Sequence, residues 1–456
     1  MSLNIFSRRI PRASVQHWFA NHAATAPQEK HAAGAPVKEE PKLSVLPSGL
    51  TIASIENLSP ITRIAVIIKA GARYETYENL GITHTLRYCA GLGSKETSMF
   101  HITRNIQLIG AGLRAWSSRD HFAYSLDCNR DDLDTGLEYL GKVVAEQSFR
   151  PWEVSDHLPR QKIDIAFMRS RAELVLMELL HKTAYRTGLQ NNLYCPKHMI
   201  GHHTQDMLKA FVKNHFTNKR MALVGVGIPH NVLKDYAELF DLEGGEGPAE
   251  IASQYKGGEI RLDRGGPYTY VAVAAEGVSL KTPKDILAAS VLQQALGIGP
   301  HVKRGVATSK LMQAAMKATK NPFAVSSINL NYTDSGLFGF YVVGQPEDMD
   351  TLVKALVSEF NATAKNGVAD KDFQAAKNRV KAFLLMSLES KGRMVEDMSI
   401  QALIQGKILS VDEMEKLIDS VSLGDVNNVA KKVAGSKPTM TTIGNLKNAP
   451  FLDRLK

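Results

Sequence analysis

The feature that most constrains the fold is an order of strands and helices that occurs twice along the 456 residues. Apolar runs and period-2 alternation indicate strands, and apolar residues at helical spacing indicate helices. The first copy has predicted strands at 50–57, 63–71, 121–129 and 220–227, and helices around residue 84, at 133–147 and within 153–189, with a break near Pro159. The second has a strand at 268–277, a helix at 284–297, a strand pair at 323–344, helices at 348–367 and 370–390, and a strand at 439–446.

Matching elements lie roughly 205–220 residues apart, which is far longer than a solenoid repeat. A duplicated domain explains this spacing. We therefore expect an α+β fold of two homologous domains, each a mixed β-sheet packed with helices, that enclose a cavity between them. The glycine- and proline-containing stretch 241–259 predicts a linker, and the Ala/Pro-rich stretch 32–49 leads into the first strand. The expected boundaries are 1–40 for a leader and linker, 41–242 for the first domain, 243–258 for the linker and 259–456 for the second domain.

The N-terminal segment differs from the rest of the chain in charge. Residues 1–27 contain Arg8, Arg9 and Arg12 but no acidic residue, and they account for three of the nine net positive charges. This composition is typical of a mitochondrial transit peptide, and a disordered basic tail is the alternative. Elsewhere no basic stripe with interleaved aromatics supports nucleic-acid binding, and no apolar run of about 18 residues could span a bilayer. Membrane association is therefore expected only through partners.

The three cysteines, Cys89, Cys128 and Cys195, are far apart and form no C-x-x-C pair. Neither a disulfide framework nor a thiolate zinc site is supported, and buried free thiols are expected.

One stretch of the first half contains most of a metal motif. Residues 71–75 read GARYE, Gly81 follows, and His84 begins what could be an H-x-x-E-H sequence. This pattern resembles the pitrilysin-type metallopeptidases, in the branch of the mitochondrial processing peptidases, from about Leu43 to the end of the chain. In active members two histidines on successive helical turns bind zinc, and the glutamate between them is the general base.

The departures from that motif predict that the chemistry is lost. Arg87 occupies the position of the general base and Tyr88 that of the second histidine. The resemblance places Asp164 where the distal glutamate ligand belongs and His157 where a second acidic residue is usual. A cation about 4 Å from a dication would repel it by roughly 8 kcal/mol at an effective dielectric near 20. We therefore expect no catalytic, cofactor-binding or metal-ligating residue and no cofactor.

These residues then have structural roles in our interpretation. His84 is expected to be hydrogen-bonded in the interdomain region, Arg87 to pair with a carboxylate or carbonyl, and Tyr88 to fill the space of the missing ligand. Cys89 lies on another face of the helix from His84, so it is not expected to bind a metal with it. The pair at 202–203, two histidines, has no acidic companion at ligand spacing, and it is expected to precede a helix N-cap at Thr204.

A second stretch separates branches of the family. LGIGPHVKRG at 296–305 contains Gly297, Gly299 and Gly305, with His301, Lys303 and Arg304 between them. It follows a helix and lacks the Walker lysine spacing, so nucleotide binding is excluded. The alpha subunit of the processing peptidase has a denser glycine-rich loop at this point. With the altered zinc motif and NYTDSGLFGFY at 331–341, the stretch is more similar to the core subunits of mitochondrial ubiquinol–cytochrome c reductase, respiratory complex III.

This resemblance implies a structural subunit on the matrix side of the inner membrane. It implies core protein 1 as the partner, together with cytochrome b, the c-type cytochrome subunit and the Rieske protein, in a dimeric complex without nucleic acid. The alternative is the non-catalytic, presequence-binding alpha subunit of the processing peptidase. An active or half-site peptidase would need zinc despite Arg87 and Tyr88.

Overall fold

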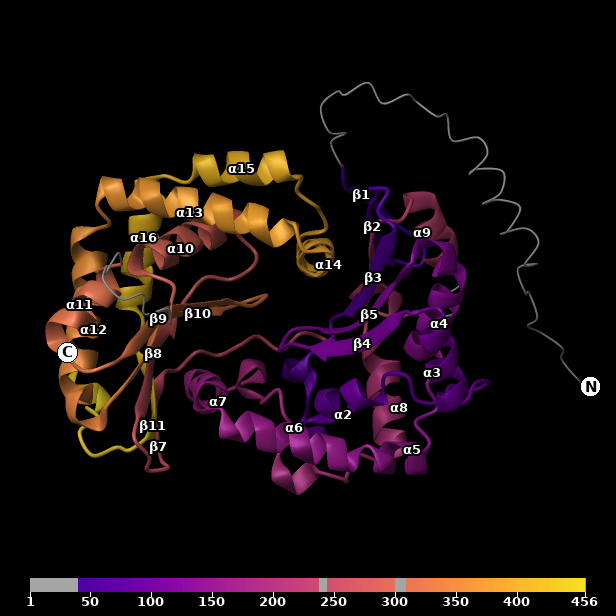
Figure 1. The fold of residues 1–456 in the computed structure, drawn as a ribbon, viewed down its shortest axis with the longest axis horizontal. Helices are drawn as coiled ribbons and strands as arrows, with labels where there is room; N and C mark the ends of the chain where they lie inside the picture. Colours follow the sequence, from indigo (N-terminus) through magenta and orange to yellow (C-terminus); the bar gives the residue numbers. More distant parts are fainter. Residues whose placement is uncertain (1–39, 238–243, 300–308, 456) are drawn as a thin grey trace, which may run out of the picture. The chain divides into compact units, whose positions relative to one another are not determined.

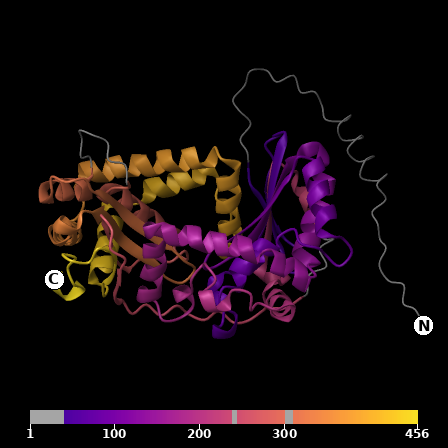
Figure 2. The ribbon, with the colours of Figure 1, turned by 60° about the horizontal axis from the view of Figure 1, so that its bottom comes forward.

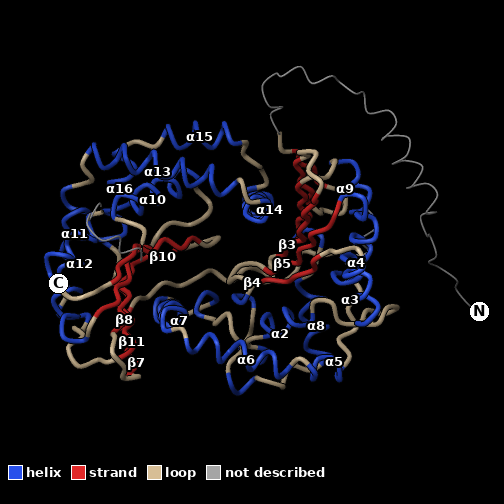
Figure 3. The backbone as a smooth tube through the Cα atoms, in the orientation of Figure 1, coloured by secondary structure: helices blue, strands red, loops and turns tan. Residues whose placement is uncertain are grey.

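The computed structural model describes residues 40–237, 244–299 and 309–455. Residues 40–456 form one compact unit that contains two β-sheets, shown in red in Figure 3. The first sheet has the order β1-β2-β6-β3-β5-β4 and the second β7-β11-β8-β10-β9. The strands of the first sheet are β1 Lys42–Val45, β2 Thr51–Ile55, β3 Ile61–Ile68, β4 Gly112–Ser117, β5 Phe122–Asn129 and β6 Met221–Val226. Those of the second are β7 Gly258–Asp263, β8 Thr269–Glu276, β9 Ala324–Asn331, β10 Gly336–Gly344 and β11 Thr439–Gly444.

Apart from β1, the two sheets have the same topology. In each sheet the first strand pairs in parallel with the last strand, and all further pairs are antiparallel. Two sheets with one strand order and one pattern of directions confirm the duplicated α+β fold predicted from the sequence. An enclosed cavity between the halves stays a prediction.

Each sheet is covered on one face by helices of its own half. The first sheet packs on α4 (Leu133–Ala145) and α9 (His230–Ala237), and α3 (Met99–Leu108) lies against α4. The second sheet shares a core with α10 (Pro283–Leu296), α11 (Lys310–Ala318), α12 (Met349–Asn366), α13 (Asp370–Leu388) and α16 (Leu423–Gly435). Figure 2 shows the long helices of the second half from another side.

The other face of each sheet is covered by a helix from the opposite half. Helix α7 (Ala172–Ala184) buries Leu176 and Leu180 against Ala272 and Ile443 of the second sheet. Helix α14 (Lys391–Ile400) packs on β3 and β6 of the first sheet, and it continues into η8 (Gln401–Gln405). Figure 1 shows α7 beside the second sheet and α14 beside the first. Each half thus covers an apolar sheet face of the other half with one of its helices. Local sequence patterns cannot predict this arrangement.

Several segments differ from the sequence prediction. The stretch at 32–49 is not only a linker, because its residues 42–45 form β1, which pairs with β2. Leu43 and Val45 are exposed, whereas the Ser44 hydroxyl lies 2.8 Å from His230 Nε2 on the side of α9, so a polar contact helps to hold this strand. The helical region 153–189 breaks near Pro159 as predicted, between α5 (Pro151–Asp156) and α6 (Leu158–Ser170), and again at Arg171 before α7. Strands β4 and β7 were not predicted.

The remaining helices are α2 (Ile82–Cys89), α8 (Gln205–His215) and α15 (Val411–Ser420). Across the described residues, no helix combines the length and apolar character needed to cross a membrane.

Candidate functional site

The GARYE lead-in positions the helix that begins at Ile82. Glu75 is buried, and its carboxylate accepts hydrogen bonds from the backbone N–H of Gly81 at 2.7 Å and of Thr83 at 3.0 Å. The Thr83 hydroxyl also donates to it, at 2.6 Å. Burial raises the pKa of Glu75 to about 7, against the effect of these bonds. Gly81 has φ +83°, and a Cβ there would lie 2.4 Å from Cys195 Cα. Both motif residues thus have a structural role at the start of α2.

His84 is fully buried on α2 and faces Asp164 of α6. Its Nε2 lies 2.9 Å from Asp164 Oδ2. Its Nδ1 is 3.2 Å from the backbone N–H of Cys195 and 3.3 Å from the Gln161 amide. Because both neighbours of Nδ1 are donors, the proton of the neutral ring is on Nε2 and is donated to Asp164. Burial, and then the charge of Arg87, lower the pKa of His84 to about 4.

Asp164 also interacts with Tyr88 and Arg87, the two residues that follow His84 at the positions the resemblance gives to the second histidine and the base. The Tyr88 hydroxyl is hydrogen-bonded to it, and Arg87 Nη2 lies 3.6 Å from its Oδ2. Burial opposes ionisation, but the bonds from His84 and Tyr88 lower the pKa of Asp164. Burial and the interaction with Asp164 raise the pKa of Tyr88 to about 12, so the phenol stays a donor.

The structure therefore brings together His84 and Asp164, the two positions that the family resemblance marks as former ligands. The guanidinium of Arg87, at the position that the resemblance assigns to the base, lies 5.5 Å from the centre of the Tyr194 ring. The Tyr88 ring contacts that of His84 edge-on, with centroids 5.4 Å apart. Both nitrogens of His84 are engaged in hydrogen bonds, so no lone pair remains for a metal in this arrangement. Within the residues that the structure describes, no group of three or more His, Cys, Asp or Glu side chains is arranged to hold a metal ion.

The other predicted positions form no hydrogen bond with His84 or Asp164, although His203 is linked to His84 through Thr85 and Gln161. His157 ends α5, and burial lowers its pKa, followed by the charge of Arg160. Cys89 is buried, and burial raises the pKa of its thiol to about 12. His203 lies 2.8 Å from the Thr85 hydroxyl, and Thr204 is the N-cap of α8, its side chain accepting from Met207 N–H as the sequence predicted.

The glycine-containing stretch is only partly within the described residues. Gly297 ends α10 with φ +121°, and the N–H of Gly299 donates to Ser326 Oγ at 3.1 Å. His301, Lys303, Arg304 and Gly305 lie outside the described residues.

A buried ion cluster that sequence reasoning missed joins the two halves. Arg73 of the GARYE motif donates from Nη1 to Asp120 at 2.7 Å and from Nη2 to Asp334 at 2.9 Å. Asp334 belongs to the turn between β9 and β10, and it also accepts from the N–H of Ser253 at 2.7 Å. The side chain of Arg73 is 2 % exposed. Its carboxylate partners raise the pKa of Arg73 although burial opposes this, and they hold it as a cation.

The rest of the β9–β10 turn is also bound by the first half. The Thr333 N–H and hydroxyl donate to Asp120, at 2.8 and 3.0 Å. The Tyr332 hydroxyl lies 2.7 Å from His181 Nε2, and the Tyr185 hydroxyl donates to the Gly336 carbonyl at 2.9 Å. The sequence contained both halves of this contact, the GARYE arginine and the turn Asp334-Ser335-Gly336. Nothing in either segment indicates that the two lie together in the fold.

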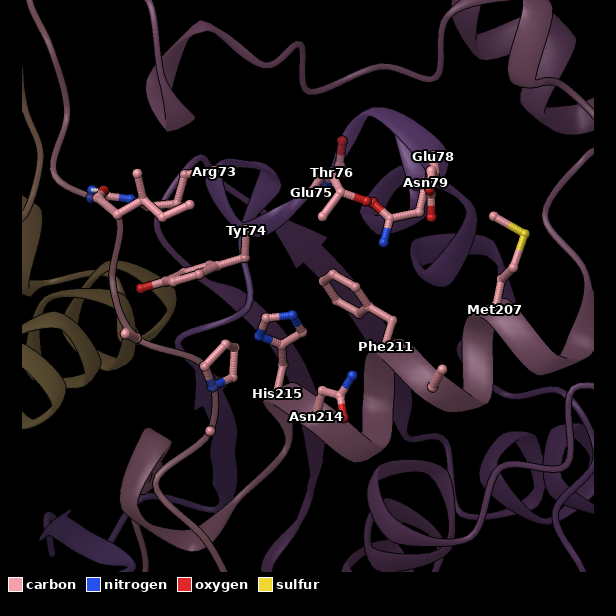
Figure 4. A pocket seen from close by; sticks show the side chains of 15 residues that line it. Arg73, Tyr74, Glu75, Thr76, Glu78, Asn79, Met207, Phe211, Asn214 and His215 are labelled. Carbon is pink, nitrogen blue, oxygen red and sulfur yellow. Dashed lines mark hydrogen bonds between the residues drawn. The ribbon is translucent and has the colours of Figure 1, made fainter.

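The pocket shown in Figure 4 is separate from the His84 cluster. It has a volume of about 630 Å³ and lies between residues 73–79, helix α8 and the linker residues 247–251. Tyr74, Phe211 and His215 form aromatic walls, as the close-up shows. Burial, and then Arg220, lower the pKa of His215 to about 4, so the walls are uncharged at neutral pH.

Comparison with known proteins agrees with this geometry. Residues 51–197 match the family model described as insulinase (peptidase family M16), and residues 202–380 match the one described as peptidase M16 inactive domain. The chain belongs to the M16 peptidase family. The family assignment predicted from GARYE, Gly81 and His84 is thereby confirmed.

Among M16 relatives, the chain is similar to core-type subunits along nearly its whole length. It is 43% identical to cytochrome b-c1 complex subunit 2, mitochondrial, of Homo sapiens, over 93% of this chain and 94% of the relative. It is 41% identical to the same subunit of Rattus norvegicus, over 94% and 96%. A probable mitochondrial-processing peptidase subunit alpha-2 of Arabidopsis thaliana is 32% identical over 90% and 84%. The expected resemblance to complex III core protein 2 is confirmed, and the alternative peptidase subunit is more distant.

Proposed function

We propose that this chain is a non-catalytic structural core subunit of the cytochrome b-c1 complex, respiratory complex III. It would support assembly and stability of the complex that passes electrons from ubiquinol to cytochrome c. The 43% identity to subunit 2 over 93% of the chain supports this role. The observation that carries the loss of catalysis is the His84–Asp164 hydrogen bond at 2.9 Å, with Arg87 and Tyr88 on the same carboxylate.

This cluster explains why no hydrolysis would occur. A zinc peptidase needs three protein ligands, an open coordination position and a general base. Here the would-be ligands His84 and Asp164 are hydrogen-bonded to each other, and Tyr88 donates to Asp164 instead of binding a metal. Arg87 has only N–H donors and no acceptor atom, so it offers no general base. His84 and Tyr88 of α2 therefore hydrogen-bond to Asp164 of α6, and Arg87 forms an ion pair with the same carboxylate at 3.6 Å.

The partners and location follow from the same proposal. The chain would pair with core protein 1 and assemble with cytochrome b, the c-type cytochrome subunit and the Rieske protein in a dimeric complex. It would lie at the matrix side of the mitochondrial inner membrane, held there by its partners, after removal of a transit peptide within residues 1–40. Its domains would span 41–242 and 259–456, joined by 243–258.

Native purification from mitochondria tests the proposal. We expect the chain to co-migrate with b-type and c-type haem and to contain no stoichiometric zinc. Co-migration with a haem-free, zinc-containing processing peptidase would instead support the alpha-subunit alternative, which the 32% identity to a plant alpha-2 subunit keeps as the second candidate. Presequence cleavage by the purified chain, dependent on added zinc, would refute the non-catalytic assignment.

A further inference from the structure

Helix α6 presents an exposed surface that combines apolar side chains with unpaired positive charge. Ile163 is 68% exposed and Phe167 is 52% exposed, and they lie one turn apart on the same side of the helix. We define the α6 surface by these two residues and four cations around them: Arg160, Lys162, Arg169 and Arg171. Figure 1 marks the position of α6.

The cations are placed at both ends and along one side of the apolar pair. Arg160 precedes Ile163 by three positions, and the guanidinium of Arg171 lies 4.1 Å from the centre of the Phe167 ring. Lys162 and Arg169 are seven positions apart and form a second row. Within residues 40–237, 244–299 and 309–455, no carboxylate lies at ion-pair distance from any of the four. The only acidic residue of α6, Asp164, is already bound by His84 and Arg87.

We propose that the α6 surface docks an acidic, apolar-faced helical segment of a partner polypeptide. Such a segment would place two apolar side chains against Ile163 and Phe167 and carboxylates opposite the cations. Arg160 and Arg169 are about 13 Å apart along α6, which corresponds to roughly two and a half turns of the docked helix. A basic segment, such as a presequence, would be repelled by the same charges.

The charge and apolar pattern favours a protein partner over a membrane surface. Helices that lie in a bilayer interface bury a broad apolar face along their length. Helix α6 offers only Ile163 and Phe167 as large exposed apolar groups, because Gln161 and Ile165 are buried against the rest of the chain. The inference rests on the proposed function only for where the partner is found, namely among the other subunits of the same complex.

Charge reversal in the full chain tests the surface. The variant Lys162→Glu with Arg171→Glu would be expressed in cells that lack the endogenous chain, and its incorporation into the haem-containing complex measured on native gels. We expect roughly tenfold less incorporation than for the wild type, because like charges would then face each other. Two controls should match the wild type: Lys162→Arg with Arg171→Lys, which keeps the charge, and Lys431→Glu with Lys432→Glu, an exposed pair on α16. Equal incorporation of all variants overturns the proposal.

A photo-reactive phenylalanine analogue at position 163 of the full chain tests the partner's chemistry independently. We expect it to cross-link to a segment of another polypeptide that has at least two carboxylates within two helical turns. Cross-links only to lipid, to the chain itself or to a segment without carboxylates overturn the inference. The variant Lys162→Glu with Arg171→Glu is also tested for binding to cardiolipin-containing vesicles. If it loses vesicle binding but is incorporated into the complex normally, the inference is overturned and the surface is assigned to lipid. If wild-type chain fails to co-migrate with haem, the proposed function fails, while the cross-link still decides the docking surface.

Discussion

Arg73 and Asp334, 261 positions apart, form an ion pair at 2.9 Å in which the arginine side chain is almost completely buried. The arginine belongs to the family motif before α2, and the aspartate belongs to the β9–β10 turn of the second half. Asp120 is bound to the same guanidinium at 2.7 Å, so one cation holds two carboxylates. The motif arginine therefore fixes the contact between the two halves rather than any part of a metal site.

Removing Asp334 should destabilise the whole chain. Breaking a buried ion pair by removal of one partner costs about 3–5 kcal/mol, and we expect the lower end because the Asp334 side chain is 19% exposed and Asp120 still binds Arg73. Asp334→Ala should therefore lower the free energy of unfolding by about 3 kcal/mol in urea titration. The exposed Asp453→Ala, on η9 (Leu452–Arg454), is the control and should unfold with the wild type. A double-mutant cycle of Asp334→Ala and Arg73→Ala measures the coupling energy between the two side chains. A coupling energy near zero would contradict the stabilising ion pair between them.

The zinc motif that the family resemblance implies should be restored in part by substitution. Replacing Arg87 with Glu and Tyr88 with His restores H-x-x-E-H on α2, and Asp164→Glu supplies the longer ligand. We expect the triple variant to bind one zinc ion per chain, whereas the wild type should bind none, measured by elemental analysis after dialysis. The single variant Arg87→Glu is the matched control, because it removes the repulsion but leaves two ligands at most. Zinc bound stoichiometrically by the wild type would show that Arg87 does not block the site.

Acidification should destabilise the chain through its buried histidines. Burial lowers the pKa of His84, His121 and His215 to about 4 in the folded chain, against an ordinary value near 6.5. These groups stay neutral when folded but take up protons when unfolded, so their contribution is complete above pH 6.5 and is lost as the pH falls towards 4. Glu75 acts in the opposite sense, since its raised pKa favours the protonated folded state between about pH 4.5 and 7.

The buried histidines, to which His181 and His203 also belong, outnumber Glu75, so the free energy of unfolding should fall between pH 6.5 and 4.5. Each group with shifted pKa contributes up to about 1.4 kcal/mol per pH unit. His84→Gln removes one such group. The free energy of unfolding of this variant should therefore change with pH less steeply than that of the wild type, by up to about 1.4 kcal/mol per pH unit. Urea titrations at several pH values measure the slopes, and identical slopes for the two proteins would falsify the role of His84.

Much of the fold could be predicted from the sequence, because duplication and strand patterns are local signals. The apolar runs that form β3, β5, β6, β8, β10 and β11 were all recognised. Strand β4 was missed because Arg114 and the surrounding half-buried residues break the alternation. The sequence could not predict that α7 and α14 each cover the sheet of the opposite half, or that Arg73 pairs with Asp334. Each contact depends on which distant segment covers an apolar face or a charge. At the candidate site, the sequence shows that Arg87 and Tyr88 depart from the motif of the resemblance. The bond from Tyr88 to Asp164 and the bond from the Cys195 N–H to His84 could be seen only in the structure.

Gly81 offers a test of the close approach between α2 and the segment at Cys195. Gly81 and Gly110 both have positive φ, +83° and +64°, so an alanine is strained at either position. At Gly110 a Cβ meets nothing within 4 Å, whereas at Gly81 it would lie 2.4 Å from Cys195 Cα. Gly110→Ala should therefore cost about 1–2 kcal/mol for backbone strain alone. Gly81→Ala should cost about 2 kcal/mol more, since the backbone of residue 195 must move and its bond to His84 Nδ1 weakens. Equal losses in urea titration would show that the contact is not tight.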